Sequence, residues 1–253
     1  MTNFSSPMQA APQTNQYLEV TCNNCGFNTI CFPRGLTQEE VTKLDNAVQR
    51  RKVLHKGDYL FRAGDPFHGL IAVKSGCAKL SYQDECGNEH ILSLLLPGEL
   101  LGFDGFSGKT YRCTAQALDT LSYCELPASQ ITQLCLRIPP LFKEILRHAG
   151  DALEIQREQL VFIKKTAEER VSSFLMDLSS RYGYRGFSTR EFSIGFTRQE
   201  LGNYLDLALA TVSRTLKQFE KEGWIRLRGK KVTILDMDSL RQLSCCGKKS
   251  ANV

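Results

Sequence analysis

The chain has 253 residues and a net charge of +5, with 42% hydrophobic and 23% charged residues. This composition is ordinary for a globular protein and excludes a wholly disordered chain, and the length favours two domains. No stretch approaches the ~18 apolar residues of a membrane span, and residues 1–16 lack the apolar centre of an export signal. We therefore expect a cytoplasmic protein without membrane contact.

The N-terminal region combines a polar tail with a cysteine cluster. Residues 1–20 are rich in Ser, Asn, Gln, Thr and Pro, which predicts a disordered tail. In the segment 21–33, Cys22, Cys25 and Cys31 follow the pattern C-x2-C-x5-C. In a chain of this length without an export signal, thiols normally stay reduced, so this spacing indicates a metal site whose fourth ligand comes from elsewhere. By this chemistry alone the metal is zinc or iron–sulfur, and zinc is the commoner structural choice.

The next region, residues 34–139, is predicted to form a β-roll domain. It begins with a helix near residues 36–48, where Thr37 and Glu40 form a capping-box pattern. From residue 51 to 127, turn signals recur roughly every 8 to 12 residues between β-prone stretches, which is typical of a small antiparallel sandwich or roll.

Residues 140–165 are predicted to form a long helix with a broad apolar stripe. A helix that lies between two domains needs a partner for such a stripe, and a parallel copy from a second subunit is the economical partner. The alternative is that the stripe packs only on its own β domain. The residues that we assign to the dimer face are Ile145, Ala149, Leu153, Ile155 and Leu160.

Residues 166–240 carry the pattern of a helix-turn-helix domain. Thr197 and Glu200 form a second capping box at the start of one short helix, and a second helix follows a tight turn. In this arrangement the second helix presents its N-terminal residues to the major groove of DNA. The predicted base-reading residues are Ser213, Arg214, Ala210 and Thr211. Arg214 is the strongest candidate because a guanidinium can bond O6 and N7 of guanine together.

The stretch 223–235 alternates apolar and basic residues about Gly229, which predicts the β-hairpin of a winged helix-turn-helix. Residues 164–231 contain fourteen Lys and Arg against eight Asp and Glu, as expected for a DNA partner. The alternative is a structural hairpin with a solvated basic surface. The predicted phosphate contacts are Thr197, Arg198, Lys217, Arg226, Arg228, Lys230 and Lys231. Residues 241–253 are expected to be a tail.

Several motifs together resemble the FNR (fumarate and nitrate reduction) regulators of the CRP/FNR family. They are the cysteine pattern, Pro97-Gly-Glu-Leu-Leu-Gly-Phe-Asp, Ala115-Gln-Ala-Leu-Asp-Thr with Cys124-Glu-Leu-Pro, Ala167-Glu-Glu-Arg, Arg185-Gly-Phe-Ser and Gly202-Asn-Tyr-Leu. The resemblance spans about residues 20–240. It implies an α+β chain with a cyclic-nucleotide-binding-like antiparallel β-roll, a long dimerisation helix and a C-terminal winged helix-turn-helix.

The resemblance also implies an oxygen-responsive regulator with a [4Fe–4S] cluster on Cys22, Cys25, Cys31 and Cys124. In the family, the intact cluster favours a homodimer that binds a palindromic operator under anaerobic conditions, and oxygen converts or destroys the cluster. The hairpin 83–89 resembles the family surface that contacts RNA polymerase, which assigns that role to Gln83, Asp84 and Glu85. The other cysteines, at 77, 86, 113, 135, 245 and 246, match no ligand position.

Three positions depart from the family pattern. Ala210 stands where a Glu is usual and Ala208 where a Thr is usual, so we expect an operator that is altered or less strictly read than the family's TTGAT half-site. In the dimer helix, Ile155 or Gln156 stands where the family's regulatory Asp would lie. Without that charge we expect a tighter cluster-free dimer.

The alternatives to this interpretation are a CRP-type regulator, a zinc-stabilised regulator and an enzyme. A CRP-type cyclic-nucleotide site needs a Glu for the ribose and an Arg–Ser pair for the phosphate, but Gly102-Phe-Asp-Gly-Phe offers no Glu and Arg112-Cys113 matches the pair only in part. A zinc-stabilised regulator would keep the four cysteines and be colourless. An enzyme is the least supported class, since the four histidines are scattered and no nucleophile–base pair or phosphate loop is present.

Overall fold

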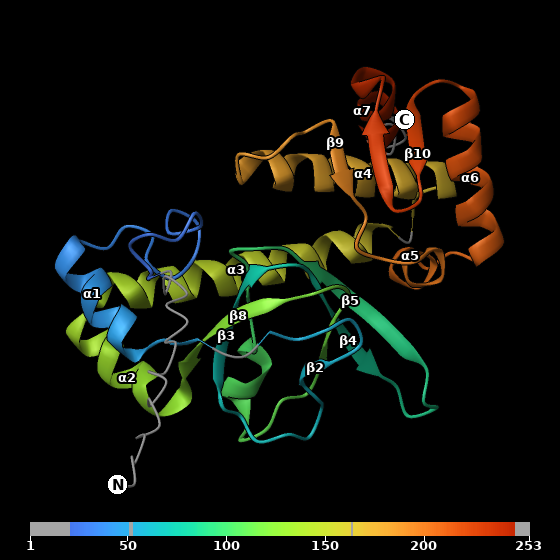
Figure 1. Ribbon diagram of the computed structural model, residues 1–253. Coiled ribbons are helices and arrows are strands. Elements are labelled where there is room, and N and C mark those ends of the chain that lie inside the picture. The colour runs from blue at the N-terminus through green and yellow to red at the C-terminus, as the bar shows by residue number, and fades with distance from the viewer. Residues whose placement is uncertain (1–20, 51–52, 163, 246–253) are drawn as a thin grey trace, which may run out of the picture.

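The computed structural model describes residues 21–50, 53–162 and 164–245, apart from the side chains of residues 158–162 and 245. A β-roll and a C-terminal helical part are joined by the long helix α3 (Pro139–Phe162), which runs beneath the C-terminal part (Figure 1). Within these described ranges, no helix is long and apolar enough to cross a membrane. The predicted tail at residues 1–20 lies outside them.

The β-roll consists of two four-stranded sheets in which every paired strand is antiparallel, which confirms the predicted roll. One sheet has the order β1 (Gln49–Arg50), β8 (Ser122–Pro127), β3 (Gly69–Ser75) and β6 (Leu100–Leu101). The other has the order β2 (Tyr59–Phe61), β7 (Thr114–Ala117), β4 (Ala78–Gln83) and β5 (Glu89–Leu95). A short 3-10 helix, η1 (Phe103–Ser107), follows β6.

Two helices flank the roll and share a core with the cysteine segment. The helix α1 (Gln38–Ala47) begins at the predicted capping box of Thr37 and Glu40, and α2 (Ala128–Arg137) leads into α3. Their apolar faces pack with Cys22, Phe32 and the first turns of α3 in one buried cluster. The position of the cysteine segment is therefore fixed by apolar contacts around it.

The C-terminal part is a winged helix-turn-helix, as predicted. It contains α4 (Ala167–Tyr184), β9 (Glu191–Ser193), α5 (Arg198–Leu205), α6 (Leu209–Lys221), β10 (Ile225–Arg228), β11 (Lys231–Ile234) and α7 (Met237–Cys245). The hairpin β10–β11 turns at Gly229, and β9 adds a third strand beside β11. The expected tail from residue 241 is wrong for residues 241–245, which continue α7 because Leu240 is buried against α4 and its neighbours.

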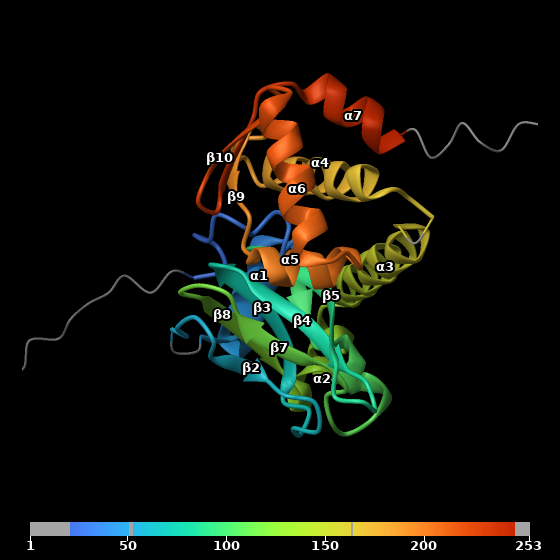
Figure 2. The same ribbon diagram turned by 90° about the vertical axis from the view of Figure 1, so that its right-hand side faces the viewer.

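The β-roll and the winged domain share one apolar core. Cys77, Ile91 and Leu94 of the roll belong to the same buried cluster as Phe174 of α4 and Leu201 of α5. Helix α5 lies between the two parts, over β5 (Figure 2). The Asn203 side chain bonds two backbone groups of β5, donating to the carbonyl of Glu89 and accepting from the N–H of Ile91.

The apolar stripe of α3 divides into two faces. Ile145 is only 6% exposed and packs with the roll and α2, so its assignment to a dimer face is wrong. Phe142, Leu146 and Leu153 are the large apolar residues of α3 that remain exposed among those described. The face that carries Ile145 therefore packs on its own chain, and the face that carries Phe142, Leu146 and Leu153 is exposed in this structure.

The shared core predicts that the two parts unfold together. Replacing Phe174, which is 2% exposed, with Ala should lower the free energy of unfolding by about 3–5 kcal/mol, because it leaves a cavity next to both parts. Leu136→Ala is the control: this side chain is 78% exposed and should change stability by no more than ~0.5 kcal/mol. Urea unfolding followed by far-UV circular dichroism measures both. Two separate transitions in the wild type would contradict a single shared core.

Candidate metal centre and nucleic-acid interface

The four predicted ligand cysteines line one small pocket. Cys22, Cys25 and Cys31 lie on a chain of consecutive turns, in which the N–H of Asn28 bonds the carbonyl of Cys25 and that of Cys31 bonds Phe27. Cys124 reaches the same pocket from β8, where it pairs with Arg50 of β1. All four thiols are free. The fold thus brings together a ligand from the roll and three from the N-terminal segment.

Burial makes this pocket unfavourable for thiolate charge. It raises the pKa of the Cys22 thiol to about 12, with Asp45 as the next cause, and it also raises the pKa of Cys31 and Cys124. The negative charge of neighbouring thiolates raises these three pKa values further. The cations Arg50 and Lys74, which line the pocket, act in the opposite direction on Cys124. A metal centre that binds thiolates would remove most of this cost.

Asp45 orients the start of the cysteine segment. Its carboxylate accepts from the N–H of Cys22 at 2.6 Å and is also paired with Arg50. Burial alone would raise the pKa of Asp45, but the hydrogen bonds from Cys22 and Arg50 lower it below its usual value. Neither Asp45 nor Arg50 was singled out from sequence, because nothing in their spacing relates them to the cysteines.

The donor set fits an iron–sulfur cluster. Four thiolates from a turn-rich segment and one strand are the usual ligands of such clusters. Among the described residues, no group of three or more His, Cys, Asp and Glu is arranged around a single ion. A single zinc ion binds thiolates at ~2.3 Å, whereas each cysteine of a four-iron cluster binds a different iron.

The helix-turn-helix is formed by α5 and α6, joined at Asp206 in the left-handed conformation. Gly202 is required there, since a Cβ would come within 2.6 Å of the Leu207 carbonyl. Arg170 of α4 donates to the carbonyls of Leu205 and Asp206 and holds the turn. These contacts give a structural reason for two of the family motifs, Gly202-Asn-Tyr-Leu and Ala167-Glu-Glu-Arg.

The predicted base-reading residues lie on the free side of α6. Ala210 and Arg214 are exposed, and Thr211 and Ser213 are half-buried. The opposite side carries Val212, Leu216 and Phe219 in the core. Ala208 is the N-cap residue and supplies no side-chain hydrogen bond, so the first N–H groups of α6 have no cap from this side chain. Such an N-terminus can face a phosphate or a base edge.

The predicted phosphate contacts differ in exposure and in the partners of their side chains. Arg226, Arg228 and Lys217 are exposed. The exposed Lys231 pairs with Glu191 at 2.7 Å, and Lys230 donates to the carbonyl of Gly195. Arg198 is half-buried, and the Thr197 hydroxyl caps α5 by accepting from the N–H of Glu200. Thr197 is therefore primarily a helix cap.

The backbone N–H groups of Arg112 and Cys113, the partial match to the phosphate-binding pair of a cyclic-nucleotide site, already have a partner. The Asp104 carboxylate accepts from the backbone N–H groups of Arg112 and Cys113 at 2.7 and 2.8 Å. Adjacent N–H groups of this kind bind anions, so an internal carboxylate takes the place that a ligand phosphate needs and repels it. This contact argues against the cyclic-nucleotide alternative.

The hairpin between β4 and β5 is held together by Asp84. Its carboxylate accepts from the N–H groups of Cys86 and Asn88 and from the His90 ring. These bonds, with His90 first, hold the pKa of Asp84 well below its usual range. Gln83 and Glu85 are exposed, but the Gln83 amide also helps to close the hairpin by donating to the carbonyl of Gly87 at 2.9 Å.

Family models match both parts of the chain. Residues 51–137 match the model "Cyclic nucleotide-binding domain", and residues 169–243 match "Crp-like helix-turn-helix domain". The transcriptional activator protein anr of Pseudomonas aeruginosa is 40% identical over 238 residues, which cover 94% of this chain and 95% of that protein. The chain belongs to the CRP/FNR family of transcription regulators. It is an FNR-type, DNA-binding regulator and not an enzyme.

Other relatives and solved structures agree with this assignment. The fumarate and nitrate reduction regulatory protein of Vibrio cholerae is 38% identical over 91% of this chain and 93% of its own length. The structure of FixK2 from Bradyrhizobium japonicum matches the fold with a TM-score of 0.70 at 22% identity, covering 78% of this chain and 96% of that one. The fold and family inferred from the motifs are thereby confirmed.

Arg214 on α6 and Arg228 on the β10–β11 hairpin are predicted to contact DNA in different ways, the first at a base and the second at a phosphate. Arg214→Ala should cost about 1–3 kcal/mol of binding to the preferred operator and relax selectivity at one base pair, because a base contact is lost. Arg228→Ala, at the exposed end of β10, should weaken binding to all sequences alike and reduce the salt slope by about 1. Fluorescence anisotropy titrations on matched and single-substituted duplexes, at several salt concentrations, distinguish the two. A uniform loss for Arg214→Ala would refute its base-reading role.

Proposed function

We propose that this regulator senses oxygen through a [4Fe–4S] cluster held by Cys22, Cys25, Cys31 and Cys124, and that it controls anaerobic transcription in the cytoplasm. The observation that carries the proposal is the meeting of Cys124 with the three cysteines of the N-terminal segment in a pocket without a competing ligand set. The names of relatives, "Anaerobic regulatory protein" among them, support the anaerobic role.

When bound, the cluster supplies a centre whose reaction with oxygen changes its ligation. The chain must convert that change of ligation into a change of its own structure. Cys22, Cys25 and Cys31 lie on the N-terminal segment and Cys124 lies on β8, so a change of ligation alters what ties the segment 21–33 to the roll. Since this segment packs in the same core as α1, α2 and the start of α3, such a change biases what lies along α3.

We propose that α3 pairs in parallel with α3 of a second copy. The exposed Phe142, Leu146 and Leu153, with Ala149 between them, repeat at intervals of four, three and four residues, the spacing of a coiled-coil seam. Gln156 continues this seam and is exposed, whereas Ile155 is half-buried on its own chain. Ile155 is therefore not part of the seam, and the predicted Leu160 side chain lies outside the described residues. A dimer of this kind places two α6 helices on a palindromic, FNR-box-like operator.

The ligand assignment is tested by a pair of cysteine variants. Cys124→Ser should abolish cluster binding, because it removes the ligand that joins the segment to the roll. Cys135→Ser is the matched control, since Cys135 is half-buried in the same core but does not line the pocket. Each protein is purified without oxygen, and its iron, acid-labile sulfide and visible absorption are measured. Full iron and sulfide content in Cys124→Ser, or zinc in place of iron in the wild type, would refute the assignment.

The seam predicts how charge controls the dimer. At neutral pH the cluster-free wild type should be dimeric at micromolar concentration, because Gln156 introduces no charge repulsion across the seam. Gln156→Asp should raise the dimer dissociation constant by at least about tenfold, because like charges then oppose each other. Gln156→Asn is the neutral control. Sedimentation velocity measures all three, and a clean wild-type monomer at micromolar concentration would contradict the expectation.

We further propose that the β4–β5 hairpin contacts RNA polymerase through Gln83 and Glu85. Asp84→Ala cannot test this cleanly, because Asp84 holds the turn. Glu85→Ala should reduce activated transcription in a purified system while leaving operator binding unchanged, since its side chain is exposed and lies far along the chain from α5 and α6. Glu39→Ala, at an exposed position of α1, is the control. Full transcription from Glu85→Ala would argue against this surface.

A further inference from the structure

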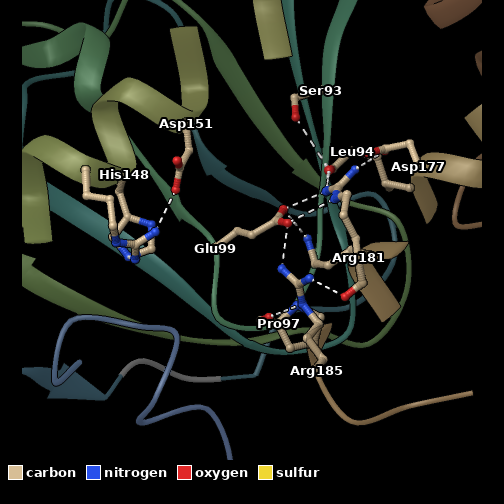
Figure 3. Close-up of polar contacts among 11 residues, drawn as sticks. Ser93, Leu94, Pro97, Glu99, His148, Asp151, Asp177, Arg181 and Arg185 are labelled. Atoms are coloured by element: carbon tan, nitrogen blue, oxygen red, sulfur yellow. Dashed lines mark hydrogen bonds and ion pairs between the residues drawn. The ribbon is translucent and has the colours of Figure 1, made fainter. Parts of the chain in front are cut away.

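Two family motifs that have no role in metal or DNA binding meet in a buried ion-pair network. Glu99, in the turn after β5, receives bonds from two arginines of the winged domain (Figure 3). Its Oε1 lies 2.6 Å from Arg185, and its Oε2 lies 2.7 Å from Arg181. Arg185 also donates to the carbonyl of Pro97 at 2.6 Å. The motif beginning at Pro97 is thus tied to the motif beginning at Arg185.

The network is fully paired and largely removed from water. The Arg185 side chain is 4% exposed, and Arg181 is further paired with Asp177 at 3.1 Å. Burial alone would raise the pKa of Glu99, but Arg181 and Arg185 lower it, and the carboxylate also accepts from the N–H of Leu96. A buried charge that loses its partner is strongly unfavourable, so the turn 97–99 and the end of α4 must move together.

The same turn lies against the cysteine segment on its other side. Gly98 has φ +87°, and a Cβ there would come within 2.5 Å of the Ile30 side chain. Ile30, which immediately precedes the ligand Cys31, is buried by this contact. The segment is therefore in van der Waals contact with the turn that holds α4, at a position where any larger residue would push it away.

A second contact joins the segment to the winged domain directly. The rings of Phe27 and Phe187 meet edge to face with centroids 6.2 Å apart. Phe27 lies between the ligands Cys25 and Cys31, and Phe187 lies in the loop between α4 and β9. That loop extends over the cysteine segment in Figure 1. Arg34, just after the segment, donates to the Tyr184 hydroxyl at the end of α4.

We propose that the turn 97–99, Arg181, Arg185 and Phe187 form a coupling junction through which the position of the cysteine segment sets the position of the winged domain within one subunit. This inference rests on the proposed function, because it requires the ligation of the cluster to change the position of the segment. The junction acts within one subunit, in addition to the proposed effect of the segment on α3. The outcome that it predicts is a change in DNA affinity that does not depend on dimerisation alone.

Phe187→Ala tests the junction without disturbing the core, because this side chain is 48% exposed. Phe106→Ala is the matched control, with 49% exposure in η1, on the roll. Glu99→Gln is the second variant, and it removes the charge that holds both arginines while keeping the shape of the side chain. For each protein, with and without the cluster, we would measure iron content, sedimentation, operator affinity and hydrogen exchange of residues 184–190.

In the wild type and Phe106→Ala, hydrogen exchange of residues 184–190 should differ between the loaded and the cluster-free protein. In Phe187→Ala and Glu99→Gln, iron content and dimerisation should stay as in the wild type. The exchange difference should disappear, and the ratio of loaded to cluster-free operator affinity should fall about fivefold or more. If Phe187→Ala keeps both the wild-type ratio and the exchange difference, the junction is refuted, whether or not Glu99→Gln folds. A wild type that binds no cluster would instead overturn the proposed function, and the junction with it.

Discussion

The antiparallel pairing of β8 with β1 and β3 is the constraint on which the candidate sensor depends. It places Cys124 opposite Arg50 and beside a segment that lies about a hundred residues earlier in the chain. The segment itself has turns but no regular helix or strand, so its position comes from Phe32 and Cys22 in the core and from the bond between Cys22 and Asp45. A rigid strand therefore faces a segment held mainly by packing. Such an arrangement suits a site that must respond to the state of its ligands.

The β-roll and the winged domain are in extensive contact, which connects the cysteine segment with the DNA-binding helices. One buried cluster runs from the roll into the winged domain, and Asn203, Lys79 and the Glu99 network cross the boundary with polar bonds. Lys79 is almost fully buried and pairs with Glu89 of β5 and Glu200 of α5. These contacts fix the position of α5, and through it that of α6, relative to the roll. The free side of α3 offers a separate surface for a second copy.

The sequence was sufficient for the main elements and for the sites that depend on short spacing. The capping boxes at Thr37 and Thr197, the hairpin about Gly229 and the base-facing side of α6 follow from local patterns that tertiary packing does not override. The stripe on α3 was ambiguous, because periodicity shows that a face is apolar but not what covers it. Ile145 was assigned to the dimer for that reason but is buried on its own chain, whereas Ile155 is half-buried.

The residues that sequence could not supply are those whose partners are distant in the chain. Asp104 with Arg112 and Cys113, Asn203 with β5, and Glu99 with Arg185 are pairs that only the fold brings together. Each of the three includes a residue of a family motif, but a motif shows that sequences are related and does not show which residues are in contact. In the same way, Asp84 was assigned to a protein contact because the hairpin 83–89 resembles a family surface, and only the structure shows that its carboxylate closes that hairpin.

The most direct test of the account is the operator affinity of one anaerobic preparation before and after exposure to air, with the cluster absorption near ~400 nm recorded in the same sample. We predict that affinity falls as the absorption is lost and that removal of the metal by a chelator produces the same fall. An affinity that stays constant while the absorption bleaches would contradict the claim that the cysteine site controls DNA binding.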